Sequence, residues 1–180
     1  MDAGSQPDIF KVRLATWFAG LESGLVGVLW MLMWLGMSSL WQQRSFWTPE
    51  NLMSTAFDRN AALNGLRWAT LAGLAVYILI YSALGAVFAV LARERVARHR
   101  VTLMGILFAV AWYYLTFRWA FKYALPLVAL LHVEVTMIAG HALYGAILGR
   151  FPVYVYRLMS TEPPQDPPMA PDIVDTPEET

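Results

Sequence analysis

The chain lacks cysteine and carries little charge. None of its 180 residues is Cys, which excludes disulfides, thiolate metal sites and a cysteine nucleophile. Charged residues make up only 14%, whereas a soluble domain usually contains about a quarter. Hydrophobic residues make up 58%, and eight residues are Trp. This composition indicates a protein that lies in a lipid bilayer.

Sequence motifs that carry chemistry are also scarce. There is no H-x-x-H, H-E-x-x-H, phosphate loop or G-x-S-x-G elbow. His132 and Glu134 are too close in sequence to share one helical face, and the three histidines do not place two haem ligands at one depth on different helices. We therefore predict no metal, no cofactor and no catalytic residue.

Four long apolar runs dominate the chain. Each approaches the ~20 residues that a helix needs to cross ~30 Å of hydrocarbon, where the backbone must satisfy its own hydrogen bonds. The sequence predicts an all-α polytopic membrane protein with four transmembrane helices arranged as two hairpins. The runs cover about 14–41, 66–92, 101–121 and 126–149. They form one transmembrane domain, 14–160, after a short flank, 1–13.

Two segments outside these runs have a character of their own. The tail, 161–180, contains six prolines and six acidic residues and is expected to be disordered. The connection after the first run contains Thr48-Pro49-Glu50, which is typical of a helix start. The stretch 48–57 is either a short helix in the membrane interface or an ordinary loop with aromatic residues.

The basic residues predict the orientation in the membrane. One side holds Lys11, Arg13, Arg93, Arg95, Arg98, Arg100, Arg150 and Arg157. The other side holds Arg44, Arg59, Arg67, Arg118 and Lys122. The denser set predicts that both termini are cytoplasmic. Arg93, Arg95, Arg98 and Arg100 are candidates for contact with anionic lipid headgroups. Because the bases occupy separate loops, we do not expect nucleic-acid binding.

Small residues form stripes on two of the predicted helices. Gly20, Gly24 and Gly27 lie on one face of the first helix, and Gly145 and Gly149 form a second small-xxx-small pair. Such stripes let helix backbones approach closely in lipid. They serve either packing within the four-helix bundle or contact with a second copy or partner subunit.

A weak internal repeat relates the second and fourth runs. With an offset of about 60 residues, 81–89 aligns with 141–149, and Gly85 lies over Gly145. The repeat would make the protein two similar helical hairpins, unless the match reflects only the frequency of Gly-Ala pairs in membrane helices.

Few ionisable residues fall within the predicted spans, and each is a candidate site. Glu134 and His141 are seven residues apart and would share a helical face about 10 Å apart. They could relay protons, or they could be structural, with Glu134 paired to Arg118 or Lys122 and His141 bonded to a backbone carbonyl or a Tyr. Glu22 also has two alternatives. It binds a proton or a partner protein, or it simply lies in the membrane interface.

Three short motifs resemble those of uncharacterised bacterial inner-membrane proteins with four spans. They are Gly20-Leu-Glu-Ser-Gly24-Leu-Val-Gly27, Trp47-Thr-Pro49 and His141-x-x-Tyr144-Gly145. The resemblance implies location in the inner (plasma) membrane and transfers no catalytic residue.

Two functions follow from these features. The first is a non-catalytic integral membrane protein that acts as an accessory or assembly subunit, or as a small homo-oligomer. Its partners would be the bilayer and either itself or another membrane subunit. The alternative is a small proton-linked or solute transport protein that uses Glu22, Glu134 and His141.

Overall fold

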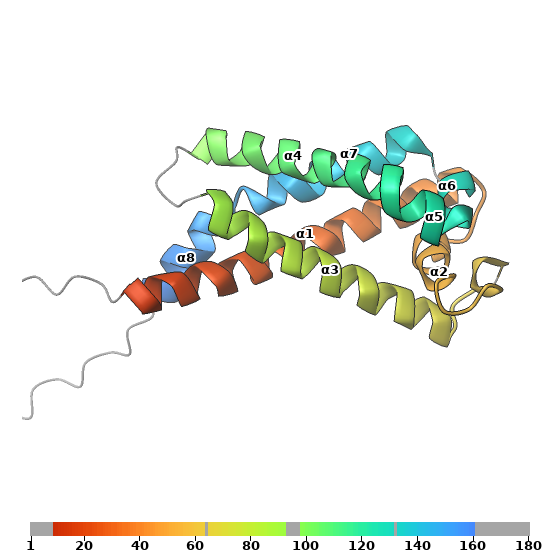
Figure 1. The fold of residues 1–180 in the computed structure, drawn as a ribbon, viewed down its shortest axis with the longest axis horizontal. Coiled ribbons are helices and arrows are strands. Elements are labelled where there is room, and N and C mark those ends of the chain that lie inside the picture. The colour runs from red at the N-terminus through yellow and green to blue at the C-terminus, as the bar shows by residue number, and fades with distance from the viewer. Residues whose placement is uncertain (1–8, 64, 93–97, 132, 161–180) are drawn as a thin grey trace, which may run out of the picture.

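The computed structural model describes residues 9–63, 65–92, 98–131 and 133–160, and all regular structure in these ranges is helical. Figure 1 shows the long helices running side by side along one axis. The elements are α1 (Ile9–Trp41), α2 (Thr48–Ser54), the 3-10 turn η1 (Ala61–Leu63), α3 (Trp68–Ala92), α4 (Arg98–Leu115), the π-helical segment η2 (Thr116–Phe121), α5 (Lys122–Ala124), α6 (Pro126–Leu131), α7 (Glu134–Leu148) and α8 (Phe151–Ser160).

Three of the helices are long and apolar enough to cross a membrane. These segments are Ile9–Trp41, Trp68–Ala92 and His99–Trp119. The chain is therefore a membrane protein by the length and composition of its helices. At 1.5 Å per residue α1 is about 50 Å long, so it extends beyond the ~30 Å of hydrocarbon in a bilayer.

The prediction of four continuous spans needs correction at the fourth. The run 126–149 is divided into α6, of six residues, and α7, of fifteen. Val133 has extended backbone angles (φ −103°, ψ 113°) immediately before α7, so one helix does not run through the segment. A count of apolar residues does not reveal this break, because Val133 is apolar and only its backbone conformation interrupts the helix. At about 22 Å, α7 is shorter than a standard span.

The helices pack around α1. This helix makes extensive contact with α3, α7 and α8, while α4 packs on α7. Direct contact between α3 and α4 is slight. The beginning of α1 and α8 lie at one end of the bundle, and α2, α5 and α6 lie at the other (Figure 1). We call these the α8 end and the α2 end.

The segment after α1 forms a short helix that is buried within the chain. Pro49 occupies the first turn of α2, as predicted, and every residue from Pro49 to Ser54 is buried. The Asn51 side chain accepts a 2.6 Å hydrogen bond from the Thr70 hydroxyl of α3. The Ser54 hydroxyl lies against the carbonyl oxygen of Ala69. α2 is thus fastened to α3, whereas an interfacial helix would keep one face on the bilayer.

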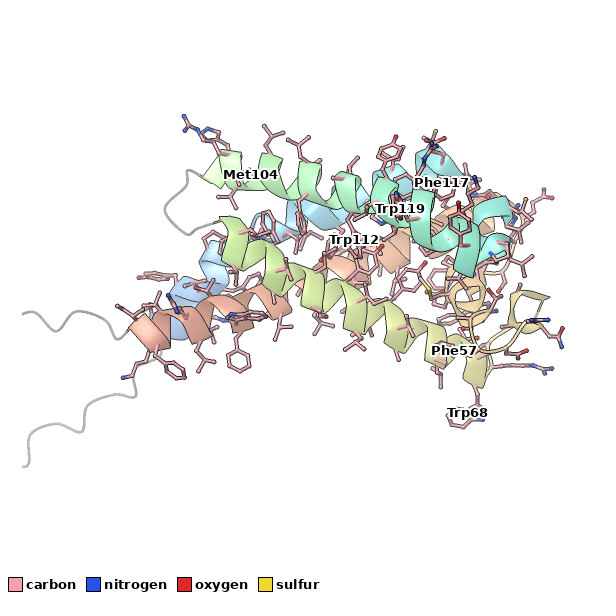
Figure 2. The ribbon with its side chains drawn as sticks, in the orientation of Figure 1. Phe57, Trp68, Met104, Trp112, Phe117 and Trp119 are labelled. Carbon is pink, nitrogen blue, oxygen red and sulfur yellow. The ribbon has the colours of Figure 1, made fainter. Side chains whose placement is uncertain are left out.

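Aromatic side chains are exposed at the α2 end. Figure 2 shows Trp68 pointing away from the bundle at the start of α3, with Phe57 nearby and Trp119 on η2. These three side chains are 86%, 70% and 71% exposed. Of the three, Trp68 and Trp119 have the amphipathic ring that is typical of a membrane–water interface.

Candidate functional site

A buried histidine occupies the middle of the bundle. His141 of α7 is 4% exposed. Its Nδ1 lies 2.8 Å from the carbonyl oxygen of Met137, and its Nε2 lies 2.7 Å from the hydroxyl of Tyr81. In the neutral ring, Nδ1–H donates to the carbonyl and Nε2 accepts from the hydroxyl. Both ring nitrogens therefore have partners within the chain, and the second bond joins α7 to α3.

Two further tyrosines lie against this bonded pair, and we call the four residues the tyrosine–histidine cluster. Its members are Tyr81, Tyr113, His141 and Tyr144, and all are buried. The Tyr113 ring of α4 lies 5.1 Å from the His141 ring between centroids. Tyr144 packs edge-on against Tyr81 at 5.1 Å, and its hydroxyl donates a 2.6 Å bond to the Tyr81 carbonyl. The cluster joins α3, α4 and α7.

Glu134 is within electrostatic reach of Tyr113 but is not buried with the cluster. It occupies the first turn of α7 at the α2 end and is exposed. Within the described ranges no ion pair connects it with Arg118 or Lys122, which are also exposed. The shared helical face that the spacing predicted therefore carries one buried and one exposed group.

Glu22 lies toward the α8 end of the bundle. Its carboxylate accepts from the Arg157 guanidinium of α8 and forms an ion pair with it. The Glu22 side chain is 33% exposed and that of Arg157 is 60% exposed. The pair fastens α8 to α1, and Glu22, His141 and Glu134 occupy three separate levels of the bundle.

The glycine stripes face other helices of the same chain. A Cβ on Gly24 would come within 2.7 Å of the Tyr81 carbonyl oxygen of α3, and one on Gly20 within 2.6 Å of Ala86. Gly27 faces the Tyr144 ring at 2.7 Å. A Cβ on Gly145 or Gly149 would overlap α4, at Gly105 or Thr102. The stripes thus serve three internal helix contacts: α1 with α3, α1 with α7, and α4 with α7.

The basic segment predicted to meet lipid headgroups is described only in part. Arg93 and Arg95 lie outside the described residues, as does His132. Arg98 begins α4, and Arg100, two residues later, is exposed. The tail from residue 161 also lies outside the described residues.

One unusual residue was not singled out by the sequence patterns. Glu50 of α2 is 2% exposed, and its Oε2 atom has no hydrogen-bond partner among the described residues. Burial raises the pKa of this carboxyl from 4.5 to about 7. The motif Thr48-Pro49-Glu50 indicated only a helix start. An acidic residue within an apolar stretch was the available signal, but its burial depends on how α2 docks.

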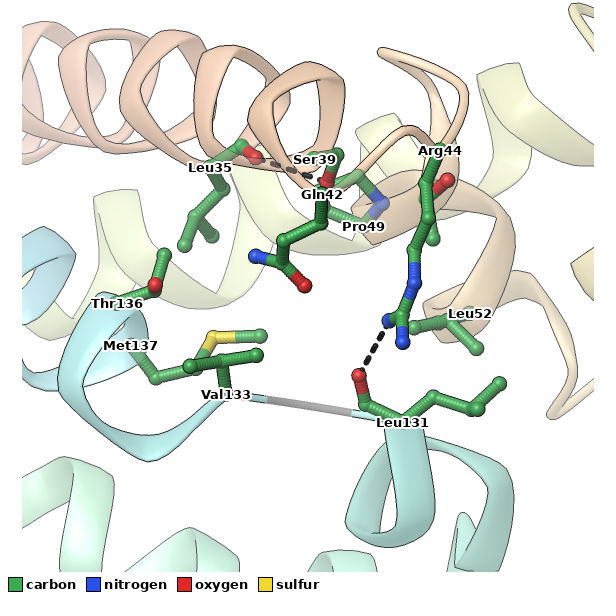
Figure 3. A pocket seen from close by; sticks show the side chains of 11 residues that line it. Leu35, Ser39, Gln42, Arg44, Pro49, Leu52, Leu131, Val133, Thr136 and Met137 are labelled. Atoms are coloured by element: carbon green, nitrogen blue, oxygen red, sulfur yellow. Dashed lines mark hydrogen bonds between the residues drawn. The ribbon is translucent and has the colours of Figure 1, made fainter.

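A small cavity lies where the end of α1 meets α2 and the break before α7. Figure 3 shows the Arg44 side chain reaching across it, and its guanidinium donates a 2.6 Å bond to the Leu131 carbonyl oxygen at the end of α6. The Trp34 indole N–H donates to the Thr136 carbonyl oxygen at 3.0 Å. The cavity volume is about 20 Å³, enough for a single water. The Arg44 bond satisfies a carbonyl that the helix break leaves without an intrahelical partner, and the Trp34 bond joins α1 to the first turn of α7.

Metal-ligating side chains do not gather anywhere in the part of the chain that the structure describes. No group of three or more His, Cys, Asp or Glu residues there is close enough to hold an ion.

Comparisons with known proteins place the chain in a family. No curated protein and no solved structure matches it. A family model matches residues 14–166, from the start of the first predicted span into the tail. The expectation of an uncharacterised family is thereby confirmed: the chain belongs to the family of unknown function DUF6789.

Proposed function

We propose that this chain is a non-catalytic integral membrane protein that acts as an accessory or assembly subunit, or as a small homo-oligomer. The observation that carries the proposal is the bonding of His141. Both ring nitrogens are used within the chain, by the Met137 carbonyl and the Tyr81 hydroxyl. A buried ionisable group with all its positions occupied acts as a structural link between helices.

The surface contacts of an assembly would come from large apolar side chains. The glycine stripes are occupied by α3, α4 and α7 of the same chain, so they are not free to hold a second copy. α1 instead exposes a row of bulky residues one helical turn apart, including Trp30, Met33 and Met37, each at least half exposed. These residues meet lipid in the monomer and would meet a partner helix in an assembly.

The alternative, a proton-linked transporter using Glu22, Glu134 and His141, has weaker support. A relay needs its groups within reach of one another, directly or through one water. Here Glu22 is paired with Arg157, Glu134 is exposed at the opposite end, and His141 is bonded between them. The three residues do not line a common cavity.

Cross-linking in native membranes tests the assembly role. A photo-reactive residue at Met33 should give adducts at multiples of 20.3 kDa for a homo-oligomer, or one heavier adduct of constant stoichiometry for a second subunit. The matched control places the same residue at the buried Met31, which should give no adduct. Monomer alone from the Met33 variant would contradict the proposal.

Proton flux into liposomes tests the alternative. We expect wild type, Glu134→Gln and His141→Gln to leak protons at the rate of empty liposomes. A wild-type flux that either substitution abolishes would replace the proposal by the transport function.

A further inference from the structure

Glu50 is the most unusual ionisable group in the described chain. It is almost completely buried, and one of its carboxylate oxygens has no partner. Other polar groups of α2 are bonded: Asn51 to Thr70, and Ser54 to the carbonyl oxygens of Glu50 and Ala69. The carboxyl group has one opposing contact, a hydrogen bond with the backbone of Glu50 itself, which is a smaller effect than burial. A buried carboxylate with so little compensation is costly. The carboxyl group in this position therefore favours its protonated form.

Within the described residues, the helices packed around α2 supply no counter-charge. α2 packs against α3, η1, the end of α1 and α6. Of these, η1, α6 and the last eleven residues of α1 contain no ionisable side chain. α3 brings Tyr77, a buried phenol within electrostatic reach of Glu50 that is uncharged in this pH range and therefore supplies no positive charge. The nearby Arg44 directs its guanidinium to the Leu131 carbonyl oxygen.

The backbone contact between α2 and α3 is especially close at this residue. A Cβ added to Gly73 would overlap the carbonyl oxygen of Glu50 and the hydroxyl of Ser54. Gly73 lies one helical turn from Tyr77 on the same face of α3. A charge that appears on Glu50 is therefore generated inside a tight helix contact, where water reaches it only if α2 moves away.

We propose that Glu50 is a proton-binding site that controls the docking of α2 on α3. With the proton bound, α2 stays docked. When the proton leaves, the carboxylate gains hydration by displacing α2, and this exposes the part of α3 around Gly73 and Tyr77. This inference is independent of the assembly function proposed above.

The direction of the pH effect follows from linkage. Burial raises the pKa of Glu50 to about 7 in the docked state from 4.5 when it is free. Docking is therefore fully supported below pH 4.5 and is weakened as the pH rises from there through 7. Between pH 5 and pH 8 the docking equilibrium constant should fall by roughly fiftyfold to a hundredfold.

Single-cysteine labelling of the full-length protein in lipid nanodiscs tests this proposal. The chain has no native cysteine, so Met53→Cys, at a side chain 6% exposed in α2, is the only reactive site. Phe57→Cys, at a 70% exposed position just after α2, is the reference. It corrects for thiol ionisation, because both thiols react as thiolates.

We expect the maleimide rate at position 53, relative to position 57, to rise by roughly fiftyfold to a hundredfold between pH 5 and pH 8. Glu50→Gln, a neutral isostere, should remove the pH dependence. Asp58→Asn changes an exposed acidic residue just after α2 and should leave the pH dependence unchanged. Gly73→Ala should give fast labelling at every pH. A wild-type ratio that is flat with pH, or a rise that persists in Glu50→Gln, would overturn the proposal.

Infrared difference spectra give a second readout that does not depend on α2 moving. The carboxylic-acid carbonyl band should be lost as the pH rises through about 7, and this change should be missing in Glu50→Gln. The proposal would also be overturned if the band disappeared only in the pH range in which an exposed carboxyl group ordinarily ionises.

Discussion

At the scale of single residues, the His141–Tyr81 bond joins two helices that otherwise touch little. Direct contact between α3 and α7 is slight, yet the ring and the hydroxyl meet at 2.7 Å in a fully buried position. Removing one partner leaves the other buried and unsatisfied, which costs more than the bond itself contributes.

A double-mutant cycle on this bond tests its structural role. Tyr81→Phe and His141→Phe should each destabilise the protein by about 1–3 kcal/mol, because each leaves a buried polar group without its partner. The double variant should lose less than the sum of the two. Unfolding in mixed micelles measures all four proteins. Strictly additive losses would show that the two side chains do not interact.

The residue types of this site were partly predictable from the sequence. Both kinds of partner expected for His141, a backbone carbonyl and a tyrosine, are present. The pairing of Glu134 with Arg118 or Lys122 was expected only because these residues lie at the same end of neighbouring helices. It does not occur within the described residues. The burial of Glu50 was not predictable, because it depends on the docking of α2 and not on any local pattern.

At the scale of elements, two glycine crossings hold the bundle together. Gly85 of α3 meets Gly20 and Gly24 of α1, and Gly145 of α7 meets Gly105 of α4. Gly85 and Gly145 are aligned by the 60-residue offset, and the same offset relates Tyr81 to His141, which bond to each other. Residues related by this offset thus touch each other, as residues near an axis between two repeats would, and the two-hairpin arrangement stays a prediction.

Adding one methyl group at a crossing tests its importance. Gly145→Ala should destabilise the protein by about 1–3 kcal/mol, because the new Cβ overlaps the Gly105 backbone and the helices must separate. Gly65→Ala is the matched control, since a Cβ there meets nothing within 4 Å and its φ is not positive. Thermal unfolding compares the two. Equal stability of both variants would contradict the crossing.

At the scale of the whole molecule, the path of the last helices decides the topology. α8 packs against α1 and is fastened by Arg157 to Glu22. α6 lies at the opposite end (Figure 1). The chain therefore returns along α7 to the end at which α1 begins, although α7 alone is too short to count as a membrane-spanning helix.

The long helices were predictable because length and apolarity determine them directly. The runs 66–92 and 101–121 correspond to α3 and to α4 with η2, and the first helix begins five residues earlier than expected. The divided fourth run was not predictable in the same way, since an extended residue such as Val133 leaves the average hydropathy unchanged. The bonds from Trp34 and Arg44 that stabilise this break are contacts between distant segments.

Accessibility to a membrane-impermeant maleimide tests the topology. Because the end of α8 lies beside the start of α1, we expect Ser160→Cys and Ile9→Cys to be labelled from the same side. Asp58→Cys, at the α2 end, should be labelled from the opposite side. Each variant carries the only cysteine in the chain, and permeabilised membranes provide the control for reactivity. If Ser160→Cys reacts from the same side as Asp58→Cys, α6 and α7 do not carry the chain across, and the protein crosses the membrane three times.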